Sequence, residues 1–230
     1  MIRVFKRLPL GILLLGATML WVSCATEHVR LRMVDASPTA PNIDVLVDGK
    51  MVVTNAAYES ASNYLTFQSG TRRVEVRVAG TTTPDLIDTK PSLSGHKDYT
   101  FLAANFVASI TPVVLTDDNS APASGQVKVR LIQASPTAAG VDVYLVAPGT
   151  DITTVSPTVT NLAFEAATPY QSVAAGSYEV FVTPTGTKTI EFDSGALTLN
   201  AGQIRTGVTL DNAGGGTTPL GAFVVLADLN

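Results

Sequence analysis

The chain contains an internal repeat, and this repeat constrains its fold more than any other sequence feature. The segment Val29–Ala40 reads VRLRMVDASPTA, and Val127–Ala138 reads VKVRLIQASPTA. The agreement continues downstream, where Asp44 and Asp142 stand in matching Ile/Val-Asp-Val triplets and the runs VVLTD and VVLAD close the two copies. A repeated segment of this length indicates two units built on one fold.

The repeat also sets the predicted domain boundaries. We expect one domain at residues 29–118 and a second at residues 127–230. The linker between them, residues 119–126, consists of small and polar residues with one proline and no periodicity, which is typical of a connection. Upstream lie residues 1–23, predicted to be an export signal, and a short leader at residues 24–28.

Within each copy, apolar and polar residues alternate over short runs. Val29, Leu31 and Met33 alternate with two arginines, and a period of two is typical of a strand with one buried face. Asp48-Gly49 suits a tight hairpin turn because both positions tolerate positive φ. We expect about seven strands per copy, including 43–47, 72–78, 99–105, 111–116, 205–210 and 220–227. The sequence therefore predicts an all-β fold of two tandem antiparallel immunoglobulin-like β-sandwich domains.

Residues 1–23 have the layout of a secretory signal. Three basic residues lie in the first seven positions, an uncharged and mostly apolar run follows from Leu10 to Val22, and small residues surround Cys24. Such a segment is a targeting signal and takes no part in the fold.

Cys24, the only cysteine, resembles the lipid acceptor of a bacterial lipoprotein signal. The lipoprotein pattern prefers leucine three residues before the cysteine, and Trp21 holds that place here. Lipidation of Cys24 predicts a membrane-anchored mature chain. The alternative is ordinary cleavage just beyond Cys24, which gives a soluble secreted protein. A lipidated Cys24 also excludes a disulfide, a thiolate nucleophile and a cysteine metal site.

The charge of the predicted mature chain excludes nucleic acid as a general partner. The whole chain carries a formal charge of −4, and removing the three basic residues of the signal leaves 12 basic against 19 acidic residues. A net negative domain has no overall attraction for nucleic acid or anionic lipid. Arg72, Arg73 and Arg77 cluster locally, and we interpret them as the solvated face of a strand.

The repeated Ala-Ser-Pro-Thr-Ala segments, each followed by Val/Ile-Asp-Val, resemble the bacterial family called domain of unknown function 4397. The DDNSAP stretch in and before the linker and the late DNAGGG turn resemble it too. The resemblance implies an exported or lipid-anchored protein with tandem copies. It implies no activity, because none comes with the family.

Three residue types occupy the same places in both copies: Ser37 and Ser135, Pro38 and Pro136, and Asp44 and Asp142. They could contact a ligand. The structural interpretation is a Ser-Pro turn and an aspartate that fixes a loop through local hydrogen bonds. Repetition fits the structural interpretation better, because both copies must make the same turns.

Few side chains in the sequence could form a catalytic site. A serine triad needs a histidine beside the nucleophile, and the predicted mature chain has only His28, at the leader, and His96, in a turn. We therefore expect no enzyme activity, no cofactor and no metal, although a carboxylate pair stays open. Asp117-Asp118-Asn119 offers oxygen ligands for calcium without the spacing of a known loop, and a solvated turn is the favoured interpretation. The tyrosines Tyr58, Tyr64, Tyr99, Tyr170 and Tyr178 could stack on sugars, but most should be packing residues.

These observations favour a non-catalytic, lipid-anchored protein of the bacterial cell envelope with a structural, adhesive or binding role. We expect it at the outer membrane or cell surface, with secretion as the alternative. A second hypothesis is a glycan- or protein-binding accessory module of a surface complex, with an envelope protein or glycan as partner. A third is a secreted hydrolase with an unfamiliar site.

Overall fold

The computed structural model describes residues 27–215 and 220–228. It confirms the predicted all-β fold, with sandwich-like sheets and only two short 3₁₀ turns, Val107–Ser109 and Ile152–Thr154, in the described part of the chain. The predicted signal segment and its Cys24 lie outside the described residues. Over the described residues, no helix has the length and apolar character to cross a membrane.

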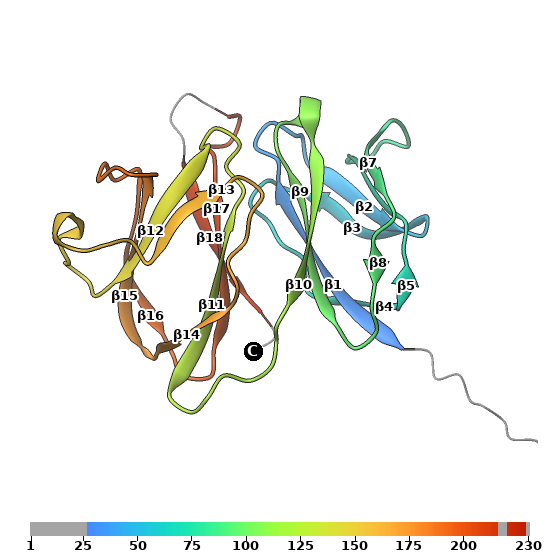
Figure 1. Cartoon of the computed structure of the whole chain (residues 1–230). Helices are drawn as coiled ribbons and strands as arrows, with labels where there is room; N and C mark the ends of the chain where they lie inside the picture. Colours follow the sequence, from blue (N-terminus) through green and yellow to red (C-terminus); the bar gives the residue numbers. More distant parts are fainter. Residues whose placement is uncertain (1–26, 216–219, 229–230) are drawn as a thin grey trace, which may run out of the picture.

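Residues 28–117, here called the N-terminal half, form two four-stranded sheets and one short two-stranded sheet (Figure 1). The sheet orders are β10-β9-β1-β4, β3-β2-β6-β7 and β5-β8. The strands are β1 (His28–Ala36), β2 (Ile43–Val47), β3 (Lys50–Ala56), β4 (Leu65–Gln68), β5 (Gly70–Thr71), β6 (Val74–Val78), β7 (Asp85–Thr89), β8 (Ser92–Leu93), β9 (Asp98–Ala104) and β10 (Thr111–Asp117).

Residues 126–227, the C-terminal half, form two further four-stranded sheets in the corresponding orders, β18-β17-β11-β14 and β13-β12-β15-β16. The strands are β11 (Gln126–Gln133), β12 (Gly140–Val146), β13 (Val159–Ala163), β14 (Gln171–Ala174), β15 (Gly176–Pro184), β16 (Phe192–Leu199), β17 (Ile204–Leu210) and β18 (Ala222–Ala227). Eight strands thus build the two larger sheets of each half over the described residues. The sequence pattern missed half-exposed edge strands such as β7, whose residues carry little alternation.

The predicted hairpin at Asp48-Gly49 joins β2 to β3. Both residues have positive φ, 51° and 75°, which is the conformation that matches the right-handed twist of the flanking strands. The amide of Asp48 donates to the carbonyl of Arg73, and its carboxylate accepts the amide of Arg73. The turn is therefore tied to the start of β6 as well as to its own hairpin.

The expectation of fully antiparallel sheets is wrong at one pairing in each half. β1 runs parallel to β9, and β11 runs parallel to β17. The physical reason is the connection: a parallel pair needs a long crossover, and about 60 residues of β2 to β8 separate β1 from β9. Between them the chain passes through β2 and β3 of the facing sheet, β4 at the edge of β1, and β6 and β7 of the facing sheet, and it then enters β9 in the same direction as β1.

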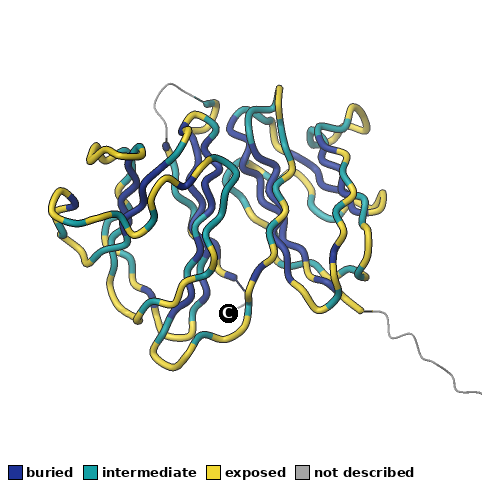
Figure 2. Tube along the Cα trace, viewed as in Figure 1, coloured by how far each residue is buried: buried dark blue, intermediate teal, exposed yellow. Residues whose placement is uncertain are grey.

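The two halves face each other through the sheets that contain these parallel pairs (Figure 1). Figure 2 shows much of the buried chain along the strands in the middle of the molecule, with further buried stretches in the outer sheets. β9 is buried at every residue, because one face packs inside its own sandwich and the other packs on the C-terminal half. A single apolar cluster spans the two halves and contains Val34, Ala36, Leu102, Ile132, Ala134, Val208, Leu210 and Leu226.

Candidate functional site

The repeated aspartates bind backbone amides. Asp44 accepts the amide of Asn55 at 2.7 Å and that of Gly80 at 2.8 Å. Asp142 accepts the amides of Asn161 and Gly186 at 2.8 and 2.9 Å. Each aspartate thereby fixes one asparagine with positive φ, near 50°, and one glycine turn. The geometry gives both carboxylates a structural task at the same place in each half.

The repeated Ser-Pro turns lie at the ends of β1 and β11, and both serines are fully buried. The amide of Ser37 donates to Asp35, and the amide of Ser135 donates to Gln133. The hydroxyl of Ser135 donates to Asp211, whereas the hydroxyl of Ser37 has no hydrogen-bond partner among the described residues. The carbonyl of Pro38 accepts the amide of Gly214, so this turn also contacts the C-terminal half; Pro136 occupies the matching position in the second turn.

The strongest electrostatic feature is a pair of buried ion pairs that cross between the halves. Arg32 of β1 lies 2.8 Å from the carboxylate of Asp228, and Arg130 of β11 lies 2.7 Å from that of Asp117. The four side chains are at most 3% exposed. Arg32 and Arg130 are equivalent in the repeat, as are the two aspartates. The arrangement is therefore reciprocal: each half supplies an arginine to the aspartate of the other.

The same contacts surround both ion pairs. Tyr64 donates its hydroxyl to Asp117 at 2.6 Å, and Tyr170 donates to Asp228 at 2.9 Å. The guanidinium of Arg32 lies 4.9 Å from the centre of the Tyr64 ring, and that of Arg130 lies 4.6 Å from the Tyr170 ring. Burial raises the pKa of both tyrosine hydroxyls, so both stay protonated and serve as donors. Thr100 and Thr206 complete the network by donating to Asp117 and Asp228.

Sequence reasoning missed this cluster, although its members repeat. The alternation in β1 placed Arg32 on a polar, solvent-facing side, because one copy alone would leave that face open. The structure buries it at 2% exposure, since the second half covers the same face. The recurrence of an arginine at one strand position and an aspartate in each closing run was the signal that could have indicated a shared interface.

In the Asp117-Asp118-Asn119 segment, weighed above as a calcium site, both aspartates form ion pairs with basic side chains. Asp117 pairs with Arg130, as described above, and Asp118 lies 2.7 Å from the ammonium of Lys128. Hydrogen bonds from Lys128 and Ser120 lower the pKa of Asp118 to about 2. Asn119 donates its side-chain amide to Asp98 at 2.9 Å. These contacts bind the segment around the start of the linker to β9 and β11. The described residues contain no cluster of three or more metal-ligating side chains.

The remaining predicted candidates separate into surface and interior. The side chain of His96 is 80% exposed and lies 3.9 Å from the carboxylate of Glu27. Arg72 and Arg73, just before β6, and Arg77 within it pair with Asp48, Asp88 and Asp85. Their side chains are only partly exposed, at 24%, 42% and 18%, so they are engaged in ion pairs rather than fully solvated. Tyr99 is buried in the N-terminal core, whereas Tyr58 donates to the carbonyl of Asp211 across the interface and Tyr178 donates to that of Ala174.

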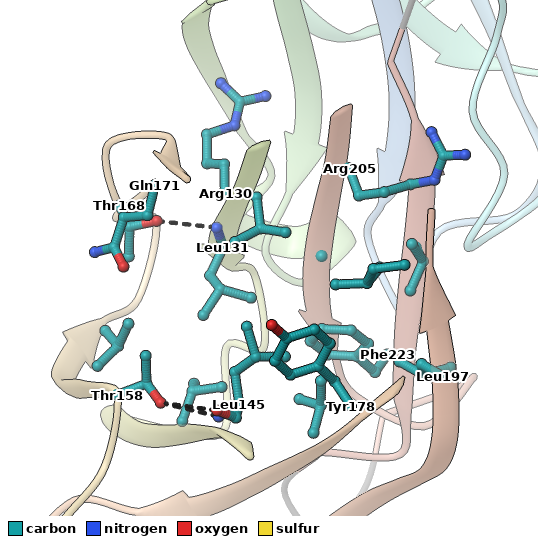
Figure 3. Close-up of a pocket in the computed structure, with 17 residues that line it drawn as sticks. Arg130, Leu131, Leu145, Thr158, Thr168, Gln171, Tyr178, Leu197, Arg205 and Phe223 are labelled. Carbon is teal, nitrogen blue, oxygen red and sulfur yellow. Dashed lines mark hydrogen bonds between the residues drawn. The ribbon is translucent and has the colours of Figure 1, made fainter. Parts of the chain in front are cut away.

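A cavity of about 60 Å³ lies between the two sheets of the C-terminal half (Figure 3). Its walls are mainly apolar and include Val129, Leu131, Val143, Leu145, Val180, Leu197, Leu199 and Phe223. By the strand registers, Arg205 and Gly207 stand here where the N-terminal half has Tyr99 and Phe101. The hydroxyls of Thr158 and Thr168 accept backbone amides of the wall strands. These two hydroxyl oxygens are therefore already engaged in hydrogen bonds within the fold.

Phe223 fills part of the space that Gly207 leaves. A Cβ atom on Gly207 would lie 2.3 Å from the tip of the Phe223 ring, which itself stacks on Phe192 at 5.4 Å between centroids. A glycine is thus required at this position for the ring to enter. The C-terminal core thus contains Phe223 from the neighbouring strand β18 in place of an aromatic residue at the position of Phe101. The cavity is the space that Phe223 leaves unfilled.

Asp35 is a buried carboxylate with a strongly raised pKa. Burial raises its pKa from the usual value of 3.8 to about 7, against the opposing effect of the hydrogen bond from the Ser37 amide. The equivalent residue of the C-terminal half is Gln133, which accepts the matching amide without a charge. The N-terminal half therefore carries a titratable group at the position where the C-terminal half has a neutral amide.

We expect Arg32→Met to lower the free energy of unfolding by about 3–5 kcal/mol, because it leaves Asp228 buried without its cation. Arg30→Met is the matched control: Arg30 also contacts an aspartate bidentately, but its side chain is 46% exposed, so the loss should stay within about 1 kcal/mol. Urea denaturation measures both. Equal losses in the two variants would contradict the assignment of Arg32 to the interface.

We expect Asp35 to make the folded state less stable as the pH rises from about 4 to about 7. In this window the unfolded chain has released the proton of Asp35 and the folded chain still holds it, so the free energy of unfolding falls and then stays low above pH 7. Asp35→Asn should remove this part of the slope and stabilise the protein at pH 8 by on the order of 2–4 kcal/mol.

Urea denaturation of wild type and variant at pH 4.5, 6 and 8 checks this difference. Asp118→Asn is the control, because the pKa of Asp118 is lowered to about 2 and both states are ionised over most of this window. A difference between wild type and Asp35→Asn that does not change with pH would show that Asp35 does not titrate here.

Comparison with solved structures gives only distant similarities. A family 26 carbohydrate-binding module from Eubacterium rectale, determined with maltoheptaose, is 10% identical, with 88% of this chain and 98% of that chain covered and a TM-score of 0.26. The TIE protein of Bacillus anthracis is 9% identical with a TM-score of 0.25, and the match covers 81% of this chain and 34% of that one. A candidate cell adhesion protein from Bacteroides fragilis is 11% identical, with 88% and 97% covered and a TM-score of 0.21.

Similarities this weak assign neither a ligand nor an activity to the chain. No curated protein sequence matches it. The sequence profile of one family does match, over residues 29–144, which is just over half of the chain. This stretch holds the first copy of the repeated segment, the linker and the second Ser-Pro turn with its following strand. The chain belongs to the family described as domain of unknown function (DUF4397).

Proposed function

We propose that this chain is a non-catalytic, lipid-anchored protein of the bacterial cell envelope, whose two halves are tandem copies of one immunoglobulin-like domain at residues 29–118 and 127–230. The two copies act as one rigid body with a structural, adhesive or binding role. The observation that carries the proposal is the reciprocal pair of buried ion pairs, Arg32–Asp228 and Arg130–Asp117.

Rigidity follows from the placement of these charges. A domain pair joined only by residues 119–126 would move freely, since short linkers of small residues are flexible. Separating the two copies here would instead expose an apolar cluster and leave two arginines and two aspartates without their oppositely charged partners. A fixed arrangement of two modules suits a protein that holds or displays a surface at a set distance from a membrane.

The same cluster supports a role without catalysis. Its arginine, aspartate, tyrosine and threonine side chains are the kinds that an acid–base site would use. They are bound to one another; the arginines, aspartates and threonines are buried between the two halves, and the two tyrosines are half-buried. This arrangement favours stabilisation over turnover and places the hydrolase hypothesis behind the binding one.

Anchoring through Cys24 would place the N-terminal copy next to the membrane. β1 begins at His28, only four residues after the cysteine, and in the view of Figure 1 it starts at the outer lower corner of the N-terminal half. The leader therefore gives limited reach, and the C-terminal copy would extend away from the lipid. We propose that the protein lies at the outer membrane or cell surface. Its partner there is an envelope protein or a glycan.

We expect Cys24→Ala to move the protein from the membrane pellet to the soluble fraction of the exporting host, because a single cysteine carries the proposed lipid. Blotting of fractions measures the shift, and Arg30→Met, which leaves the cysteine in place, is the matched control. Retention of the Cys24→Ala protein in the pellet would exclude lipidation as the anchor. Protease treatment of intact cells then decides surface exposure, since only an exposed protein is cut.

A further inference from the structure

The N-terminal half contains a cavity of about 130 Å³ between its two larger sheets. Its walls come from both sheets and from residues 60–62, which pair with the edge of β1; the apolar wall residues include Met33, Ile43, Val45, Val53, Val76 and Phe101. An apolar cavity of about 150 Å³ is large enough to bind benzene. The space therefore suits a molecule of about six heavy atoms.

Asp35 faces this cavity. Leu31 and Met33 are the inward residues of β1 and belong to the N-terminal core, and Asp35 is the next residue on the same face. Asp35 is only 2% exposed and lines the cavity. One carboxylate oxygen accepts the amide of Ser37 at 3.1 Å, whereas the other is buried with no hydrogen-bond partner in the described part of the chain. A buried carboxylate oxygen without a donor is costly unless something else satisfies it.

The C-terminal half shows how the same position is satisfied when no ligand is needed. Gln133 accepts hydrogen bonds from the amide of Ser135 at 2.7 Å and the hydroxyl of Thr209 at 2.8 Å, and it donates to the carbonyl of Ala138 at 2.8 Å. By the strand registers, Ala103 lies beside Asp35 where Thr209 lies beside Gln133. The N-terminal half thus has a carboxylate where the C-terminal half has a neutral amide, and it lacks the hydroxyl donor beside it.

A third difference opens the space itself. Ala56 of β3 lies opposite Ile43, and Leu162 of β13 lies opposite the equivalent Val141. Ala56 lines the cavity, whereas the larger Leu162 belongs to the apolar core of the C-terminal half. Three exchanges at one place, Leu to Ala, Thr to Ala and Gln to Asp, therefore create room, an unmet acceptor and a negative charge together.

We propose that this cavity binds a small primary amine with an aliphatic body of about four to six carbons. The ammonium group donates to the unpartnered oxygen of Asp35, and the body contacts the apolar walls formed by Val45, Val76 and Phe101. An amine matches better than an alcohol, because a cation is the partner that a buried carboxylate lacks. The ligand enters beside Ala61, which is exposed, while its neighbours Ser60 and Ser62 are half-buried.

Isothermal titration calorimetry of the purified protein with isobutylamine and isobutanol tests the proposal at pH 8. We expect saturable binding of isobutylamine at least tenfold tighter than binding of isobutanol. Asp35→Asn keeps the acceptor for the Ser37 amide and removes the charge. It should weaken the binding of isobutylamine at least tenfold and leave the affinity for isobutanol unchanged. Asp118→Asn, which removes an exposed carboxylate outside the cavity, should change neither ligand.

Two variants test the cavity directly. Ala56→Leu places at the wall the side chain found in the C-terminal half and should abolish binding of both ligands. Ala103→Thr supplies to Asp35 the hydroxyl donor that Thr209 supplies to Gln133, so it should weaken the binding of isobutylamine but not that of isobutanol. If circular dichroism shows that Ala56→Leu is unfolded, the test rests on Ala103→Thr. Absence of saturable isobutylamine binding to wild type, or equal affinity for wild type and Asp35→Asn, would overturn the proposal without affecting the anchored, two-copy assignment.

Discussion

The ion pairs Arg32–Asp228 and Arg130–Asp117 determine how the two halves can sit together. Both pairs lie in the interior, where a charge without a partner costs several kcal/mol. In the observed arrangement every one of the four charges meets its opposite, and each carboxylate also accepts a tyrosine and a threonine hydroxyl. A sliding of one sheet over the other would break two ion pairs at once. The charges therefore select one relative placement of the halves, while the apolar cluster beside them favours burial in general.

The reciprocity of these contacts has the form of a contact between two identical subunits. In a two-fold dimer, residue i of one subunit contacts residue j of the other, and j contacts i in return. Here the arginine of β1 meets Asp228, just after β18, and the arginine of β11 meets Asp117, the last residue of β10. An interface of this kind is consistent with a chain in which one unit was duplicated and kept its self-complementary face. The linker then holds both copies at high local concentration.

The sequence predicted the features that each copy can fix alone. The strand at Ile43–Val47, the Asp48-Gly49 hairpin and the long strands near residues 99–105 and 111–116 follow from alternation and turn residues, which are local. The burial of Arg32 could not follow from the same rule, because a period of two indicates two faces and does not say what covers the second. The parallel pairing of β1 with β9 was missed for a related reason: register between distant strands depends on the path of the chain between them.

The interiors of the two halves differ at positions that the repeat and the strand registers relate to each other. At the interface, exchange of one arginine or aspartate would leave its partner unpaired, so change there is coupled across the halves. Inside each sandwich, a change affects one copy only, and the cores differ accordingly: Phe101 corresponds to Gly207, Ala56 to Leu162 and Asp35 to Gln133. Ordinary drift in packing would exchange apolar residues of similar volume. Asp35 differs in kind: it is a buried carboxylate where the other half has Gln133 with all its hydrogen bonds made, and the neighbouring hydroxyl donor is missing. Apolar packing cannot supply a hydrogen-bond donor to its free oxygen. A ligand that supplies one would therefore stabilise the N-terminal cavity more than any other place in the described fold.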